Sequence, residues 1–249
     1  GIGTLCEAFK LDLLLHLTDT RSSLNLRGAG GVIFADIIGN RHQLEDAVNQ
    51  GIPCVVINNY LKDLEVSCIA IDNTRGAEEA VKYLISLGHR KIAHISGDLV
   101  TQAASWRLEG YKRALGTNNI EIKDEYIFKT DYSRGQARLA AENLIKMSNP
   151  ASAVFVASDS MALEVMAVAR ESGRNIPGDL SIVGFDDNPS GLYGPVALTT
   201  VRQPLIKMAE ESVKELNRLM SSKKSAPVRK ILLPTELVIR ESCKPLKSA

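Results

Sequence analysis

The sequence predicts an α/β protein built on parallel β-sheets. Short apolar runs alternate along the chain with longer segments whose apolar residues recur at helical spacing, and this alternation is typical of strand–helix–strand units. Most of the runs are continuously apolar, as expected for parallel strands that helices cover on both faces. The runs are too many for one tidy sheet, so we expect two similar α/β halves.

Each predicted strand is one of these apolar runs. Only 13 residues separate Leu17 from Gly31, which leaves little room for a crossover helix between the first two strands. The predicted strands lie at residues 11–17, 31–35, 54–58, 68–72, 91–96, 153–158, 180–185 and 231–239.

Amphipathic segments between the strands predict the helices. Apolar positions from Ala77 to Leu87 form one stripe, with Asn73 or Thr74 as its N-cap and Gly88 as its C′ residue. The remaining helical stripes lie at residues 3–10, 105–115, 135–147, 160–172 and 205–220.

Composition and charge exclude several classes of protein. The 249 residues are 45% hydrophobic and 24% charged, with a formal net charge of +1, which is ordinary globular composition. No basic cluster resembles a nucleic-acid footprint. No apolar run approaches the ~18 residues that a membrane span requires, so we expect no contact with a membrane.

The four cysteines indicate a reducing compartment. Cys6, Cys54, Cys68 and Cys243 show no CxxC spacing, and Cys54 and Cys68 lie in apolar runs where a thiol acts as a small hydrophobe. Reduced cysteines are typical of cytoplasmic proteins. No secretory signal is present, although the sequence lacks an initiator Met and this absence therefore says little.

Motifs for enzymatic chemistry are absent from the sequence. It contains no GxGxxG, GxxxxGKS or GxSxG pattern, so neither a cofactor nor a catalytic residue is predicted. The stretch "ASDSMA" follows a strand and enters a helix, which suits Asp159 or Ser160 as an N-cap. His89 follows a predicted helix and is expected to be a capping or solvated residue.

The adjacent carboxylates Asp186 and Asp187 follow a predicted strand and allow four interpretations. They could order a turn, act as a general acid/base pair, hold a magnesium ion or anchor a small molecule. Ligands of open α/β sheets lie beyond the carboxyl ends of the strands, where Asn58, Ser158 and Asp186 are found. A carboxylate together with the guanidinium of Arg107 could clamp vicinal hydroxyls of a sugar, and Trp106, Tyr132 or Phe185 could stack on its ring.

Three long stretches resemble the lactose/galactose repressor (LacI/GalR) family. They are "LGHRKIAHISG" followed by "RLEGYKRAL", then "FVASDSMALEVMAVARESGRNIPGDLSIVGFDD", and "LTTVRQP" followed by "LLPTELVIRESC". Their order and spacing follow the family over roughly residues 30–243. The resemblance implies a type I periplasmic-binding-protein-like fold, in which two Rossmann-like subdomains with parallel sheets flank an effector cleft. The three crossovers would lie near residues 71–73, 202–203 and 234–235, so that one subdomain holds residues 1–72 and 203–234 and the other holds 73–202 and 235–249.

The same resemblance assigns effector-binding residues one at a time. Arg107 would grip effector hydroxyls and Asp186 would accept their hydrogen bonds. Ser158 takes the polar position of the family's "AND" motif, Tyr132 forms the aromatic wall, and Gln203 lies at the hinge. Asn58 replaces a frequent acid, whereas Asp187 is left to order the turn. No metal ligand is implied.

These expectations describe the sensing core of a bacterial repressor rather than an enzyme. The family's first strand and its helix-turn-helix headpiece are not present in this sequence, so operator DNA would be contacted through that missing headpiece. A homodimer and a sugar or sugar phosphate effector are expected. Two alternatives stay open: a solute-binding protein of a sugar transporter, and a magnesium-dependent hydrolase that uses Asp186 and Asp187.

Overall fold

The structure is a computed structural model that describes residues 2–15, 26, 28–35, 37, 39–194, 196–222 and 226–246. The chain divides into two compact units. Unit 1 comprises Gly1–Ile71 and Pro204–Leu233, and unit 2 comprises Asp72–Gln203 and Pro234–Ala249. The backbone therefore passes between the units at three points, after Ile71, after Gln203 and after Leu233.

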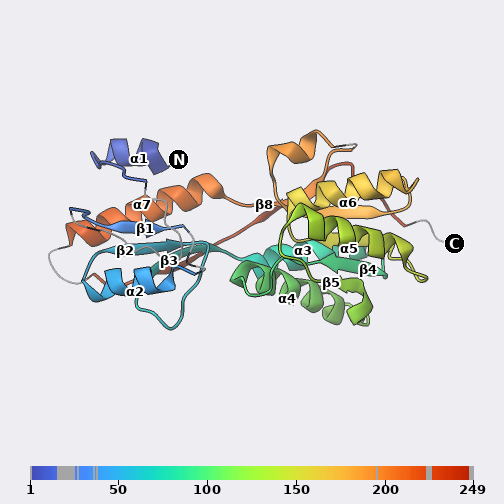
Figure 1. Cartoon of the computed structure of the whole chain (residues 1–249), viewed down its shortest axis with the longest axis horizontal. Helices are drawn as coiled ribbons and strands as arrows, with labels where there is room; N and C mark the ends of the chain where they lie inside the picture. The colour runs from blue at the N-terminus through green and yellow to red at the C-terminus, as the bar shows by residue number, and fades with distance from the viewer. Residues whose placement is uncertain are drawn as a thin grey trace. The chain divides into compact units, whose positions relative to one another are not determined.

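Unit 1 is built on a four-stranded parallel sheet with the strand order β1-β2-β3-β9. Helices α2 and α7 lie on opposite faces of the strands, and α1 packs against α7 (Figure 1). Leu44 of α2 joins the buried thiols of Cys54 and Cys68 in one core cluster. The elements are α1 (Ile2–Ala8), β1 (Val32–Phe34), α2 (Arg41–Asn49), β2 (Cys54–Ile57), β3 (Ser67–Ile71), α7 (Leu205–Ser221) and β9 (Lys230–Leu233).

Unit 2 is built on a six-stranded sheet with the order β10-β8-β7-β6-β4-β5. Its strands run parallel except β10, which pairs antiparallel with β8. Its elements are α3 (Asn73–Ser86), β4 (Ile92–Ile95), α4 (Gln102–Thr117), η1 (Asp124–Tyr126), β5 (Ile127–Phe128), α5 (Arg134–Lys146), β6 (Ala153–Val156), α6 (Asp159–Glu171), β7 (Ser181–Asp186), η2 (Pro189–Leu192), β8 (Thr199–Arg202) and β10 (Glu236–Val238). The α/β class with parallel sheets is confirmed.

The core of unit 2 differs between the two faces of the sheet. Helices α5 and α6 cover one face in an aliphatic cluster. On the other face, the His94 ring stacks between Tyr111 and Phe155 at centroid distances of 5.1 and 4.9 Å, and Phe155 contacts Phe185 at 6.5 Å. We call these four side chains the aromatic column. His94 Nδ1 donates to the Phe155 carbonyl, and burial lowers the pKa of His94 to about 4.

Helix boundaries confirm one predicted cap and correct two others. Gly88 follows the C-cap of α3 with φ +90°, the left-handed conformation expected of a C′ glycine. The N-cap of α3 is Asp72, whose carboxylate accepts from the Arg75 amide, instead of Asn73 or Thr74. Ser158 caps α6, so the predicted caps Asp159 and Ser160 lie inside the helix.

Several element predictions were wrong. Residues 11–15 form no strand, and residues 16–17 of that prediction lie outside the described residues. The run 231–239 forms two strands of different sheets, β9 and β10, because Pro234 cannot donate to a ladder and separates them. Helix α2 and the strands β5 and β8 were not predicted from the sequence.

His89 is buried instead of capping a helix or facing solvent. Its ring nitrogens lie 2.9 Å from Ser152 Oγ and 3.1 Å from Ser181 Oγ. Nε2 also lies 3.1 Å from the carbonyl of Lys244, so His89 ties the turn before β4 to the C-terminal segment. Burial lowers the pKa of His89 and favours the neutral ring.

Gly110 allows the close approach of α3 and α4, and Gly110→Ala is expected to destabilise the protein. A Cβ there would lie 2.2 Å from the Thr74 carbonyl oxygen and 2.8 Å from Ala77 Cβ. Overpacking of this kind costs about 1–3 kcal/mol, measurable as a lower midpoint of urea unfolding. Gly116→Ala is the matched control, because a Cβ at this position of α4 meets open space and should be neutral or stabilising. Equal midpoints for both variants would contradict the packing argument.

Candidate functional site

Arg107 and Asp186 approach each other at the carboxyl end of β7. Asp186 is the last residue of β7, and Arg107 lies on the buried side of α4 together with Ala104, Gly110 and Tyr111. Arg107 Nη1 lies 3.6 Å from Asp186 Oδ1. The arginine side chain is 6% exposed, whereas that of Asp186 is 34% exposed. The pair therefore presents a carboxylate at a strand end with a fixed guanidinium behind it.

Three neighbours hold the Arg107 guanidinium in place. Nε donates to Asn73 Oδ1 at 2.8 Å, and Nη1 donates to the Ala157 carbonyl at 2.5 Å. The guanidinium carbon lies 3.7 Å from the centre of the Phe185 ring, a favourable cation–π geometry. These contacts involve Nε, Nη1 and the guanidinium carbon.

Gln203 contacts the same carboxylate oxygen of Asp186 as Arg107 does. Its Nε2 donates to Asp186 Oδ1 at 2.6 Å. Burial raises the pKa of Asp186, against the lowering influence of Arg107 and of the Gln203 hydrogen bond. The structure thus brings three of the predicted residues, Arg107, Asp186 and Gln203, into one contact group.

Ser158 and Tyr132 follow β6 and β5 of unit 2, two strands that β4 separates in the sheet. Ser158 is 6% exposed and its Oγ caps α6 by accepting from the Met161 amide, so the hydroxyl already has a structural role. Tyr132 follows β5 with φ 67°. Its ring lies against Gly97, where an added Cβ would lie 2.0 Å from Tyr132 Cζ. Glycine at position 97 therefore makes room for the tyrosine ring.

Two further candidates are placed differently from the others. Asn58 belongs to unit 1, where it follows β2 as an exposed residue with φ 65°. Phe185, considered as a stacking aromatic, is fully buried beneath Arg107 and belongs to the aromatic column. Its ring therefore supports the arginine and does not form an exposed stacking surface.

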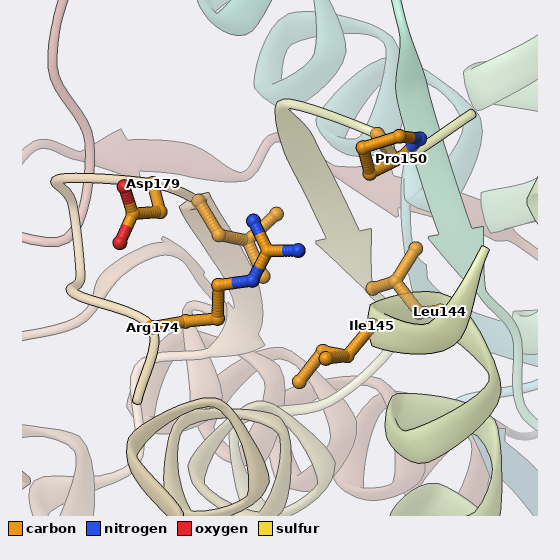
Figure 2. Close-up of a pocket in the computed structure, with 7 residues that line it drawn as sticks. Leu144, Ile145, Pro150, Arg174 and Asp179 are labelled. Carbon is orange, nitrogen blue, oxygen red and sulfur yellow. The ribbon is translucent and has the colours of Figure 1, made fainter. Parts of the chain in front are cut away.

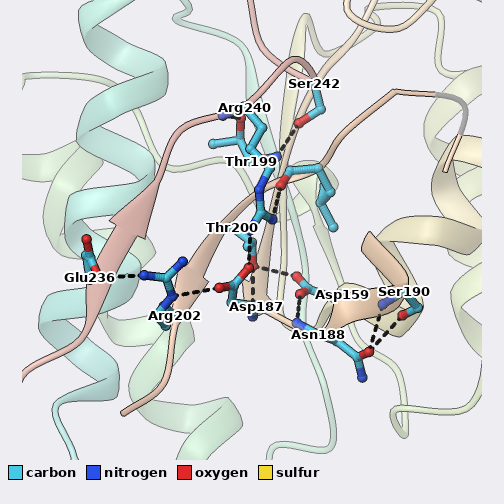
Figure 3. A network of polar contacts seen from close by, with 11 residues as sticks. Asp159, Asp187, Asn188, Ser190, Thr199, Thr200, Arg202, Glu236, Arg240 and Ser242 are labelled. Atoms are coloured by element: carbon cyan, nitrogen blue, oxygen red, sulfur yellow. Dashed lines mark hydrogen bonds and ion pairs between the residues drawn. The ribbon is translucent and has the colours of Figure 1, made fainter. Parts of the chain in front are cut away.

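Asp187 has a different environment from that of its neighbour. Its carboxylate accepts from Arg202 Nε at 2.7 Å and from Arg240 Nη2 (Figure 3). Burial acts to raise the pKa of Asp187, but the hydrogen bonds from Arg202 and Arg240 outweigh it and leave this pKa lowered. The Asp187 carboxylate is therefore paired with two arginines, whereas the Asp186 side chain is partly exposed.

The described residues do not assemble the donor set of a magnesium site. No group of three or more His, Cys, Asp or Glu side chains among them could hold a metal ion. Of the two acids considered as magnesium ligands, Asp187 already accepts hydrogen bonds from Arg202 and Arg240 with its two carboxylate oxygens. The Asp186 side chain is 34% exposed, so its carboxylate is accessible to a small molecule.

Asp159 is a buried acid that the sequence analysis treated only as a helix cap. Its side chain is fully buried, Oδ1 accepts from Thr200 Oγ1 at 2.5 Å and Oδ2 accepts from the Asn188 amide at 2.7 Å. Burial raises the pKa of Asp159 to about 7, against those two hydrogen bonds. Thr200 lies 41 positions along the chain, so no local pattern could have revealed this contact.

A small hollow lies at the other end of the unit 2 strands from the Arg107–Asp186 pair. Figure 2 shows Arg174 and Asp179 on one side of it and Leu144, Ile145 and Pro150 on the other. Its lining includes Ala151 and Leu180, which precede β6 and β7. The hollow therefore lies at the amino ends of the strands and has no part in the Arg107–Asp186 site.

Comparisons with known proteins define the class and then the family. Residues 81–243 match the family described as the periplasmic binding protein-like domain. The chain is 40% identical over 177 residues to the HTH-type transcriptional regulator MalR of Clostridium butyricum, covering 71% of this chain and 52% of MalR. It is 34% identical over 230 residues to the HTH-type transcriptional regulator DegA of Bacillus subtilis, covering 91% of this chain and 68% of DegA.

A solved LacI family transcriptional regulator from Enterococcus faecium, with bound ribose, superposes with a TM-score of 0.88 at 26% identity and covers 99% of this chain and 92% of its own. Fold and site thus define a periplasmic-binding-protein-like domain. The chain belongs to the lactose/galactose repressor (LacI/GalR) family of regulators, which confirms the resemblance seen in its motifs. It spans about half the length of MalR and about two thirds that of DegA. Among the helices described, none combines the length and apolar character of a membrane span.

Proposed function

We propose that this chain is the effector-sensing and dimerisation core of a bacterial transcriptional repressor that responds to a sugar or a sugar derivative. The observation that carries the proposal is the Arg107–Asp186 pair at the carboxyl end of β7. A sugar hydroxyl both donates and accepts hydrogen bonds. Two vicinal hydroxyls therefore fit a guanidinium donor beside a carboxylate acceptor.

The known relatives favour a regulator over a component of a transporter. MalR and DegA are both named HTH-type transcriptional regulators, and the Enterococcus faecium relative holds ribose. The proposal accordingly includes a cytoplasmic homodimer and operator DNA that is contacted by the helix-turn-helix of the full-length regulator. No step of it breaks a covalent bond.

The proposed mechanism is thermodynamic linkage. A ligand that binds one arrangement of the two units more tightly shifts the population toward it by its difference in affinity. Paired headpieces must match half-sites about one helical turn apart. A small change in the core of each protomer is therefore enough to change operator affinity.

A thermal-shift screen tests the ligand-binding part of this proposal. The probes are D-ribose, D-glucose, cellobiose, glucose 6-phosphate and adenosine, each at up to 10 mM. A ligand at 100 times its dissociation constant adds about 2.7 kcal/mol to stability, which appears as a rise of several degrees in Tm. We expect at least one sugar to raise Tm for the natural chain but not for Asp186→Asn. Glu121→Gln is the control, because its side chain is 77% exposed and precedes η1, on the amino side of β5 and not at the carboxyl end of a strand.

The outcomes separate the candidate ligands. A shift with adenosine alone would replace the sugar by a nucleoside, and no shift with any probe would count against the small-molecule site. A shift retained by Asp186→Asn would remove Asp186 from the site. The regulatory part is tested by fluorescence anisotropy, in which the sugar must change the affinity of the full-length regulator for its operator.

A further inference from the structure

The backbone at the end of β7 adopts a conformation that its residues do not favour. Asp186 has φ 121° and Asp187 has φ 57°, both within the region that side chains with a Cβ rarely adopt. Two consecutive residues of this kind persist only where the surroundings hold them. The conformation of Asp186, which carries the proposed ligand acceptor, therefore depends on what holds its neighbour.

The Asp187 side chain restrains this backbone through two ion pairs. It is 14% exposed and pairs with Arg202 of β8 and with Arg240, whose side chains are 46% and 15% exposed. Arg240 in turn donates to the Leu198 carbonyl at 2.8 Å. Backbone amides give weaker support, since the Asp187 amide lies 3.4 Å from Thr200 Oγ1. Figure 3 shows Asp187 at the centre of these contacts.

The same ion pairs reach the segments where the chain leaves and enters unit 2. Arg202 also contacts Glu236 of β10 at 3.1 Å. Gln203 follows Arg202 directly and is the last residue of unit 2 before the chain passes to unit 1. Its side-chain Nε2 donates to Asp186 Oδ1. Asp187 thus acts on the site in two ways. It restrains Asp186, to which it is bonded in the chain, and it pairs with the last residue of β8, the strand that leads into Gln203.

We propose that Asp187 is a positioning residue: through Arg202 and Arg240 it holds Asp186 and Gln203 in the geometry that binds the effector. This inference rests on the proposed function, because it assigns a role within the same site. Asp187 itself contacts no ligand in this scheme, since its oxygens are engaged by the two arginines. The ion pairs of Asp187 and Arg202 also connect the ligand site to β8 and β10. These strands lie beside two of the three points at which the chain passes between the units.

The test compares three single variants with a double variant by isothermal titration calorimetry. The probes are D-ribose, D-glucose and cellobiose. Asp187→Asn keeps the side-chain shape but removes the charge, and Arg202→Gln removes one of its two arginine partners. Each is expected to raise Kd about 10-fold or more. The double variant should bind no more weakly than Asp187→Asn alone, because that change already breaks the pair with Arg202. Glu171→Gln, which loses an ion pair with Arg138 on another face of unit 2, should leave Kd unchanged.

A readout without ligand distinguishes a failure of this inference from a failure of the proposed function. Hydrogen exchange of the ligand-free protein should speed up at least 10-fold in the segment 186–192 of Asp187→Asn, while α5 and α6 exchange as before. If the natural chain binds none of the sugars, the proposed function fails and exchange alone decides the positioning role. Unchanged exchange in that segment, or an unchanged Kd in both Asp187→Asn and Arg202→Gln, would overturn the inference. A uniform rise in exchange across unit 2 would do so as well, since it indicates a merely structural ion pair.

Discussion

Replacement of Arg107 by alanine is expected to lower the free energy of unfolding by about 2–4 kcal/mol and to raise Kd for the effector at least 100-fold. The side chain is 6% exposed and donates to Asn73 and to the Ala157 carbonyl. Its loss leaves these acceptors unsatisfied, at about 1–3 kcal/mol each before relaxation, and leaves Asp186 without its cation. A 100-fold change in Kd corresponds to about 2.7 kcal/mol, a reasonable value for charged hydrogen bonds to two hydroxyls.

Urea unfolding and calorimetry measure the two effects separately. Arg113→Ala is the matched control, because Arg113 lies on the same helix with its side chain 61% exposed and pairs with Glu78 at 3.1 Å. It should change neither quantity by more than a few tenths of a kcal/mol. Arg107→Lys keeps the charge without the guanidinium fork, so it should retain more stability than alanine but still bind weakly. Full binding by the lysine variant would show that charge alone suffices.

Substitution of Asp159 by asparagine is expected to change how stability depends on pH. Burial raises the pKa of Asp159 to about 7 in the folded protein, against about 3.9 in an unfolded chain. Between these two values the folded state binds more protons, so this group makes the protein less stable as pH rises from about 4 to 7. Each pKa unit corresponds to about 1.4 kcal/mol, and the N-terminus of α6 offsets part of the cost by favouring the carboxylate.

Asparagine resembles the neutral acid and cannot ionise. The stability of Asp159→Asn minus that of the natural chain should therefore increase by about 2–4 kcal/mol between pH 4 and pH 7.5. His94 opposes this trend within each protein. Because burial lowers its pKa to about 4, its contribution makes the free energy of unfolding rise with pH. This contribution is the same in both proteins and cancels in the difference. Asp131→Asn serves as the control of opposite sign, since hydrogen bonds from Ser133 lower the pKa of that exposed acid. Parallel pH profiles for Asp159→Asn and the natural chain would show that Asp159 is ionised throughout.

Local patterns predicted much of unit 2 because its strands are buried on both sides. β4 and β6 are buried along their whole length, and β7 is buried up to Asp186. The end of each apolar run therefore marked a strand end, which placed Ser158 and Asp186 where ligands of parallel sheets bind. In contrast, β8 has the sequence "TTVR" and β5 has two residues, and neither gives a hydrophobic signal above its surroundings.

Contacts between distant segments were beyond any local pattern. Helical periodicity places polar residues outside, yet Arg107 lies inside because Asn73 and Ala157 accept its hydrogen bonds. Asp159 and His89 are buried for the same reason, with partners on other strands or loops. The split of Asp186 from Asp187 also depends on Arg240, 53 positions away. Only the family resemblance indicated Gln203 as part of the site, whereas Arg107 was also predicted from its chemistry as the partner of a strand-end carboxylate.

The support beneath Arg107 bears on how the protein could acquire new ligands. Asn73 of α3, the Ala157 carbonyl after β6 and Phe185 of the aromatic column hold this arginine, whereas Tyr132 stands on a loop, with its ring against Gly97 and the edge of the core cluster of unit 2. The anchor and the wall of the proposed site are thus built from different kinds of structure. None of the contacts that hold Arg107 involves Tyr132, so selection can diversify ligand preference at this loop position while the proposed anchor is conserved.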